Sequence, residues 1–381
     1  ARKLLCDWIT SRTPRQLLND SVGGEPSLAD IIKMLHPKPK DASQEALFAF
    51  LLGKPYDYAK LPSEAKELID FRNGKSKNLP NLDFRLLDSC PLTTEHWMQI
   101  ALQMGFTAIR MNLNTFERKG VFANEAMVAQ IAAKIRNPEF VKSSKVFPFE
   151  ILNTFKHISD TVPHQIREAL QDAMEISIQN IPEVDGQWAV CLDVSGSMSS
   201  PVSGVRMNAK TGKRESFTSK TQYVDIASLM AAGFLRKNPG TIILPFDTRL
   251  HTSKKLNPRD SVMTLSDQLA RFGGGGTQCE LPMAHLASAQ TGKTRLDGIL
   301  FLSDNESHRA IAGRTMNDYW NTIRKNNPNC QLICVDIAGG VTSQAVGPNV
   351  RLVAGFSDAV FEFIANAKNT KWVDVIEAIE L

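Results

Sequence analysis

The spacing of hydrophobic residues changes near residue 182. Before this point apolar residues recur every three or four positions, which is the period of amphipathic helices. Ser27 precedes one such run as a candidate N-cap, and Gly53 ends another. The runs predict helices of about 10 to 15 residues joined by Pro- or Gly-marked turns, an arrangement typical of stacked helical hairpins. These helices are expected at residues 27–35, 44–53, 93–105, 124–138, 148–158 and 164–178.

After residue 182 the apolar runs become short, continuous and β-branched, and each ends at an acidic residue. They lie at residues 188–194, 240–247, 297–304 and 330–339. Helical patterns follow them at residues 221–237, 260–272, 280–290, 317–326 and 371–381. Continuous apolar strands that alternate with helices predict a doubly wound α/β domain, with a parallel sheet covered on both faces. We therefore predict an all-α domain at residues 1–182 and an α/β domain at residues 183–381.

Composition is that of an ordinary globular protein. The chain has 381 residues, more than one compact core usually holds, with 43% hydrophobic and 22% charged residues. No stretch approaches the roughly 18 apolar residues that a membrane span needs. The six cysteines form no CxxC pair, which argues against zinc and favours small buried residues in a reducing, cytoplasmic compartment.

Basic residues concentrate in two segments, although the formal net charge of the chain is only +4. Residues 101–147 contain seven Lys or Arg against three Glu, and residues 206–220 contain five against Glu215 alone. Such clusters are commonly solvated faces, so charge alone does not identify a partner. The basic segment after Ser200 is expected to be a flexible loop.

Three motifs predict a cation site beyond the carboxyl ends of the strands, where such sheets bind ligands. Asp193, Ser195 and Ser197 leave the first strand at alternate positions. Thr277 follows a run of four glycines, and Asp304 ends the third strand. Carboxylate and hydroxyl oxygens are hard ligands that suit Mg²⁺ or Mn²⁺. A helix-capping turn explains the first motif alone equally well, but the three together favour a cation.

A metal-dependent nuclease is a weaker interpretation. Two-metal chemistry usually takes several bridging carboxylates, and only Asp193 and Asp304 are placed by motif. Asp247 and Asp336 are candidates by position alone. No histidine lies inside the motifs to act as a base. The other histidines of this half are interpreted as surface or packing residues: His251, His285 and His308. We predict no catalytic residues and no enzymatic activity.

The motifs "DVSGSM", "GGGGT" and "FLSD" are similar to the metal-ion-dependent adhesion site of von Willebrand factor A domains. This resemblance covers about residues 185–381. It implies that a divalent cation, Mg²⁺ first and Mn²⁺ or Ca²⁺ as alternatives, binds one set of side chains, with Asp304 acting through water. The set comprises Asp193, Ser195, Ser197, Thr277 and Asp304. In that family the cation keeps one position open for an acidic group of a partner protein.

A second resemblance spans nearly the whole chain. Residues 27–41, 92–122, 147–152 and 352–364 resemble, in order and spacing, segments of the Ro autoantigen family and its bacterial orthologues. This resemblance implies a TROVE module of HEAT-like helical repeats, a ring closed by the A domain. It also implies binding of small non-coding, Y-like RNAs and of single-stranded ends of misfolded RNAs, in RNA quality control, with an exoribonuclease as a possible partner. The matched part begins inside the module, so we expect a partial ring without its first helices.

Basic and polar residues of the helical half form the predicted RNA-binding set, guided by this resemblance. The set is His36, Lys38, Lys40, Arg110, Asn112, Arg118, Lys119 and Lys142. His36 also fits a capping or surface role. The family's basic residues upstream of it correspond to Asn19 and Gly23. A protein-interaction module that captures an acidic residue through the A-domain cation, with RNA incidental, is the alternative function.

Overall fold

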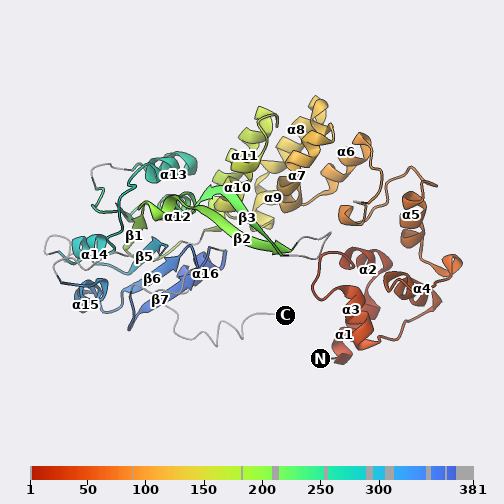
Figure 1. The fold of residues 1–381 in the computed structure, drawn as a ribbon, viewed down its shortest axis with the longest axis horizontal. Coiled ribbons are helices and arrows are strands. Elements are labelled where there is room, and N and C mark those ends of the chain that lie inside the picture. Colours follow the sequence, from red (N-terminus) through yellow and green to blue (C-terminus); the bar gives the residue numbers. More distant parts are fainter. Residues whose placement is uncertain are drawn as a thin grey trace. The chain divides into compact units, whose positions relative to one another are not determined.

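The structure is a computed structural model that forms two compact units. It describes residues 2–87, 89–181, 183–207, 214–252, 256–288, 295–304, 313–339, 345–356 and 358–365. The first unit comprises residues 1–103 and 118–121, and the second comprises residues 104–117 and 122–381. The change from helices to alternating strands and helices therefore takes place inside the second unit (Figure 1).

The first unit is built from short capped helices around an aliphatic core. Its helices are α1 (Arg2–Ser11), α2 (Pro14–Asp20), α3 (Leu28–Leu35), α4 (Ala42–Leu51), α5 (Ser63–Arg72) and α6 (Thr94–Gln103). Ser27 caps α3, as predicted, because its side chain accepts a hydrogen bond from the Asp30 amide. Thr13 and Gln16 form a reciprocal capping box at the start of α2. Ile9, of α1, is one of the fully buried residues of this core.

The helical part of the second unit packs around its last helix. Its helices are α7 (Phe106–Arg118), α8 (Glu125–Ile135), α9 (Pro138–Ser143), α10 (Pro148–His157) and α11 (His164–Ser177). Helix α11 contacts α8, α9 and α10. Leu170 and Met174, which lie four residues apart on one face of α11, are fully buried there. Asn137 caps α9, so the predicted stop of α8 is also the start of a further helix.

A five-stranded sheet forms the centre of the second unit, and all of its strands are parallel. The strand order is β4-β1-β5-β6-β7. The strands are β1 (Trp188–Asp193), β4 (Ile242–Phe246), β5 (Gly298–Ser303), β6 (Gln331–Asp336) and β7 (Val350–Ala354). Every residue of β1, β5 and β6 is buried, which is why these segments read as continuous apolar runs. The doubly wound α/β prediction is confirmed, although β7 was not expected.

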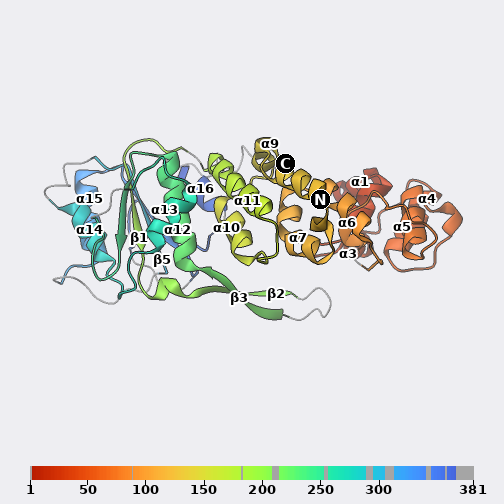
Figure 2. The same ribbon diagram turned by 90° about the horizontal axis from the view of Figure 1, so that it is seen from above.

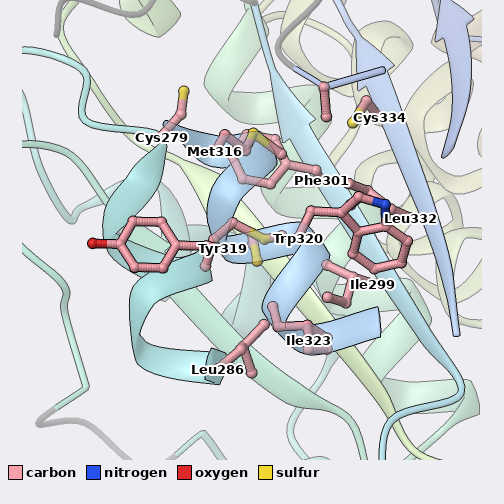
Figure 3. Packing of buried hydrophobic residues seen from close by; sticks show 14 of the residues in the cluster. Cys279, Leu286, Ile299, Phe301, Met316, Tyr319, Trp320, Ile323, Leu332 and Cys334 are labelled. Atoms are coloured by element: carbon pink, nitrogen blue, oxygen red, sulfur yellow. The ribbon is translucent and has the colours of Figure 1, made fainter. Parts of the chain in front are cut away.

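Helices cover both faces of this sheet (Figure 2). Helices α14 (Glu280–Ala287) and α15 (Met316–Asn326) lie on one face, and α12 (Tyr223–Lys237), α13 (Val262–Ala270) and α16 (Asp358–Ala365) lie on the other. Figure 3 shows the core under α14 and α15, where Trp320 and Ile323 meet Ile299 and Phe301 of β5. These four residues are at most 2% exposed. The last predicted helix, at residues 371–381, lies outside the described residues.

The basic segment after Ser200 differs from the expected flexible loop. It forms an antiparallel hairpin of β2 (Pro201–Met207) and β3 (Arg214–Gln222), inserted directly before α12. The hairpin extends away from the five-stranded sheet (Figure 2). The mixed polar sequence hid this hairpin, because its strands lack the alternation of apolar and polar residues that predicts a half-buried strand.

Aromatic rings join the start of α10 to the end of the α/β part. The rings of Phe147 and Phe361 stack with centroids 5.6 Å apart and planes at 10°. The rings of Phe149 and Phe356 meet edge to face, also at 5.6 Å. Phe147 and Phe361 are both buried, so these contacts belong to the core of the second unit.

Among the described residues, no helix is both long enough and apolar enough to cross a membrane.

Candidate metal centre and nucleic-acid interface

One tight turn after β1 holds the first three predicted cation ligands. The Ser195 amide donates a hydrogen bond to Asp193 Oδ1 at 2.9 Å. The hydroxyls of Ser195 and Ser197 lie 3.2 Å apart. Asp193 and Ser195 are buried, and Ser197 is half-buried at the rim. The turn thus gathers a carboxylate and two hydroxyls at the carboxyl end of β1, as the motif predicts.

Strand β5 brings a further pair of residues to the same edge. β1 and β5 are parallel neighbours with Leu192 opposite Leu302, so Asp193 and Ser303 occupy the next positions. Ser303 donates a hydrogen bond from its hydroxyl to Asp193 Oδ2 at 2.6 Å. Asp304 follows directly and is 7% exposed. Ser303 was not among the predicted site residues. Its position directly before Asp304, at the end of a buried strand, could have indicated that it lies at this site.

The glycine loop lies directly against this turn, backbone to backbone. The Gly274 amide donates to the Val194 carbonyl at 2.9 Å, and the Gly196 amide donates to the Gly275 carbonyl at 2.8 Å. Gly273 has φ +83°, and a Cβ there would lie 2.0 Å from the Val194 carbonyl oxygen. No other residue fits this position. The contact brings the loop that carries Thr277, which is 3% exposed, to the turn after β1.

Asp247 and Asp336 accept hydrogen bonds from backbone amides of the surrounding loops. Asp247 Oδ2 accepts a hydrogen bond from the Gly275 amide at 3.2 Å, and Oδ1 accepts from the Arg249 amide at 3.0 Å. The His251 ring nitrogen Nε2 lies 3.1 Å from the same Oδ1. Asp336 Oδ1 accepts from two amides of the turn that follows β6. Asp247 therefore supports the glycine loop, and His251 is a packing residue beside it.

Burial dominates the electrostatics of the turn. It raises the pKa of Asp193 to about 6, because a charged carboxylate loses its hydration there. Hydrogen bonds from Ser195 and Ser303 lower this pKa in part, whereas the charge of Asp304 raises it. Two buried carboxyl groups that repel each other are the environment that a divalent cation stabilises.

The donor set fits a hard cation. Two carboxylates and three hydroxyls suit Mg²⁺ or Mn²⁺, and the small share of carboxylates does not resemble a two-metal centre. Among the described residues, no group of three or more His, Cys, Asp or Glu side chains is placed to hold a metal. The residues that would hold the cation are Asp193, Ser195, Ser197, Thr277 and Asp304.

An open cleft of about 520 Å³ in the first unit is lined by two of the predicted RNA-binding residues. His36 and Lys38 line it together with Arg2 and Lys3 of α1. His36 ends α3 in the left-handed conformation with φ 48°, so the chain turns and leaves the ring exposed. Lys40 is exposed two residues beyond Lys38. Arg2 and Lys3 were missed, because no helix was predicted before Ser27.

Three of the predicted basic contacts lie at the end of α7, directly after it and in α9. Arg118, Lys119 and Lys142 are exposed, and the Lys119 ammonium lies 5.9 Å over the Trp97 ring. Asn112 is half-buried, and its amide donates to the Ala108 carbonyl within the helix at 2.9 Å. The structure thus gives Asn112 a helix-internal hydrogen bond.

Arg110 requires a correction, because the structure buries the side chain that was predicted to contact RNA. It is 7% exposed. Its guanidinium donates to Glu150 Oε1 at 2.7 Å, to the Glu150 carbonyl at 3.2 Å and to the Thr154 hydroxyl at 3.1 Å. These bonds join α7 to α10. Positive charge in the sequence does not distinguish such a cross-helix ion pair from a surface cation.

Asn19 and Gly23 stand where the Ro family has basic residues, and the structure shows what surrounds them. Asn19 accepts a hydrogen bond from the Asp83 amide at 2.8 Å. A Cβ at Gly23 would lie 2.2 Å from Nη1 of Arg85. The Arg85 guanidinium therefore occupies the space beside Gly23, held by two hydrogen bonds to the Asp83 carboxylate. Another segment of the chain supplies a cation at this position.

Comparisons with known proteins agree with this architecture. The model of the TROVE domain matches residues 85–221, and that of the Ro60 vWA domain matches residues 187–367. The RNA-binding protein RO60 of Deinococcus radiodurans is 23% identical over 306 residues, which cover 74% of this chain and 54% of that protein. The chain thus spans about half the length of this curated relative.

A solved structure shows the same fold. The crystal structure of the Deinococcus radiodurans Ro protein superposes with a TM-score of 0.70 and 18% identity, over 96% of this chain and 76% of that one. Helices followed by an A-type α/β domain define a TROVE and von Willebrand factor A protein. Both matched domains and this fold then specify the family: the chain belongs to the Ro proteins.

Proposed function

We propose that this protein binds RNA as other Ro-type proteins do, with small structured RNAs and single-stranded RNA ends as its ligands. The observation that carries the proposal is the cleft beside α3, where Arg2, Lys3, His36 and Lys38 meet. Lysine and arginine neutralise phosphates without reading sequence, and histidine can also stack on an unpaired base. The relative named an RNA-binding protein supports this assignment.

Exposed cations outside the cleft extend the proposed surface. Lys40, Arg118, Lys119 and Lys142 are exposed and belong to the proposed RNA contacts. Arg85 is added as the cation that stands beside Gly23. Arg110 is removed, because its guanidinium joins two helices.

In this proposal the protein is a ribonucleoprotein scaffold without catalytic activity. It stabilises small RNAs, acts in RNA quality control and tethers an exoribonuclease. A cytoplasmic location is part of the proposal, and the six free cysteines support a reducing compartment. The proposal assigns no catalytic role to His251, because this side chain is packed against Asp247 and Phe272.

The A-domain turn is proposed to hold Mg²⁺, with Mn²⁺ or Ca²⁺ as alternatives. The ion would neutralise Asp193 and Asp304 and would fix the two serine hydroxyls. The half-buried Ser197 marks the side at which a partner's carboxylate could reach the ion. This geometry favours one second candidate function, which is capture of an acidic residue of a partner protein.

Binding of an RNA with a single-stranded 3′ tail tests the proposal. The variant His36→Ala/Lys38→Ala/Lys40→Ala should weaken binding at least tenfold, because it removes two or three phosphate contacts. Lys54→Ala/Lys75→Ala/Lys77→Ala is the matched control, since it removes three exposed lysines of the same unit. Equal losses in both variants would show that only total charge matters and would refute the cleft.

Chelation separates the two candidate functions. RNA binding through phosphate contacts should weaken steeply between 50 and 200 mM salt and should persist in EDTA. Capture of an acidic peptide through the cation should disappear in EDTA. RNA binding that required the cation and ignored salt would contradict the proposed function.

A further inference from the structure

We propose that the β2–β3 hairpin is a nucleic-acid-binding arm, which contacts the phosphates of the RNA that the chain binds. This inference rests on the proposed RNA-binding function and assigns to it a surface in the α/β part of the chain.

Charge is the first argument. Residues 201–222 contain five Lys or Arg and one Glu, a net charge of +4. The whole chain also has a formal net charge of +4, so the remaining residues are formally neutral together. One short hairpin therefore accounts for the excess positive charge of the protein. Such a concentration raises the local concentration of a polyanion and speeds its association.

The backbone register places two of the arginines on the paired strands of the ribbon. Arg206 lies opposite Glu215, and Met207 lies opposite Arg214. The other strand cation, Lys220, is exposed near the base of β3. The single acidic residue is thus opposite one arginine and Met207 is opposite the other, whereas Lys210 and Lys213 lie outside the described residues.

Helix α10 holds the base of the hairpin in place. Asn153 Oδ1 accepts hydrogen bonds from the hydroxyls of Thr221 at 2.9 Å and Ser219 at 3.3 Å. The Lys220 amide donates to His157 Nε2 at 3.0 Å. His157 Nδ1 lies 2.7 Å from the Asn153 carbonyl, so Nδ1 is the donor of the ring and Nε2 is the acceptor.

The start of α12 adds to this anchor. Asp225 caps the helix by accepting from the Gln222 amide at 2.7 Å and also forms an ion pair with Lys156 of α10. Two polar connections therefore fix the end of β3 between α10 and α12. An arm whose base is already ordered loses less conformational entropy when it binds than a free loop does.

Nucleic acid fits this arm better than an acidic protein surface. A protein interface needs buried aromatic or aliphatic anchors at its centre. In residues 201–222 the basic and hydroxyl-bearing residues outnumber the apolar ones, and Phe217 is the only aromatic residue. Lysine and arginine with serine and threonine are the usual donors to phosphate oxygens.

Three variants test the arm separately from the rest of the protein. The first replaces the five basic residues of the hairpin by glutamine. They are Arg206, Lys210, Lys213, Arg214 and Lys220. The second replaces residues 201–222 by two glycines, which can close the gap because the Tyr223 amide already donates to the Ser200 carbonyl at 3.2 Å. The third is Asn153→Ala/His157→Ala, which frees the base and keeps the charge.

The measurement is the dissociation constant for a tailed RNA at several salt concentrations. Each lost phosphate contact lowers the slope of log affinity against log salt by about 0.7 to 0.9, so the glutamine variant should lose about 2 to 4 from the slope. Its affinity at low salt should fall at least tenfold, and the two-glycine variant should match it. The anchor variant should bind several-fold more weakly with an unchanged slope.

The outcomes distinguish the two proposals. If the unmodified chain binds RNA and the glutamine variant has the same slope and affinity, the arm is refuted and RNA binding stands. A glutamine variant that kept RNA binding and lost an acidic protein partner would refute it equally. If the unmodified chain binds no RNA at any salt concentration, the proposed function fails first and the arm fails with it.

Discussion

Replacement of Arg110 by methionine should destabilise the second unit and leave RNA affinity nearly unchanged. The guanidinium makes three hydrogen bonds between α7 and α10, one of them to the Glu150 carboxylate. Methionine fills much of the same volume, so the loss is mainly that of the ion pair. The Glu150 carboxylate, whose other oxygen accepts from the Phe147 amide at the start of α10, would remain without its cation.

The magnitude follows from the exposure of the two side chains. Removal of one partner of a fully buried ion pair costs about 3 to 5 kcal/mol. The Arg110 side chain is 7% exposed, but that of Glu150 is 29% exposed, and water can reach the abandoned carboxylate. We therefore expect a loss of about 2 to 3 kcal/mol, which lowers the folding equilibrium constant roughly 30- to 150-fold.

Urea unfolding followed by tryptophan fluorescence measures this loss, together with RNA affinity on the same samples. Arg118→Ala is the matched control, because Arg118 ends the same helix on an exposed position. It should cost less than about 1 kcal/mol of stability and should weaken RNA binding. An Arg110→Met protein of normal stability with impaired RNA binding would overturn the structural role assigned here to this side chain.

Two further predictions concern the turn after β1, which is the proposed cation site. In EDTA, Asp193→Asn should gain stability relative to the unmodified protein as the pH rises from 4 to 7. The folded pKa of about 6 exceeds the unfolded value of about 3.9, so the native carboxyl loses about 2 kcal/mol of relative stability across this window. Mg²⁺ should raise the melting temperature of the unmodified protein but not that of the variant, and a parallel pH dependence of the two proteins in EDTA would contradict the burial argument. Gly273→Ala should cost more than about 3 kcal/mol and abolish that rise, because its Cβ meets the Val194 carbonyl. Gly274→Ala, with φ +99° but open space around it, should cost only about 1 kcal/mol, and equal melting temperatures would count against the close approach.

The parallel sheet and the turn after β1 could be predicted from the sequence, because both depend on local patterns; cation binding at this turn stays a prediction. β1, β5 and β6 are buried on both faces, so their hydrophobic runs have no polar interruption. The turn after β1 combines hydroxyls at a fixed spacing after a strand with glycines where two backbones touch. The residue types at these positions can be recognised in the sequence itself. At Gly273, for example, only glycine fits beside the Val194 carbonyl.

Features that depend on contacts between distant residues were not readable. The partner of Arg110 lies forty residues away on another helix, so its burial left no local sign. The cleft residue Arg2 meets His36 only because α1 packs on α3. The hairpin was not predicted because its segment is mostly polar. Its base is held instead by hydrogen bonds to Asn153 and His157 of α10, which are distant in the sequence.

The stacked rings of Phe147 and Phe361 also constrain how the protein is made. The two residues lie more than two hundred positions apart in the sequence. The ribosome must therefore synthesise the chain through α16 before this contact can form. Until then the apolar surface at the start of α10 stays uncovered in the nascent chain. A chaperone that shields this surface during translation would therefore raise the yield of native protein, and synthesis stalled before α16 would release a product prone to aggregation.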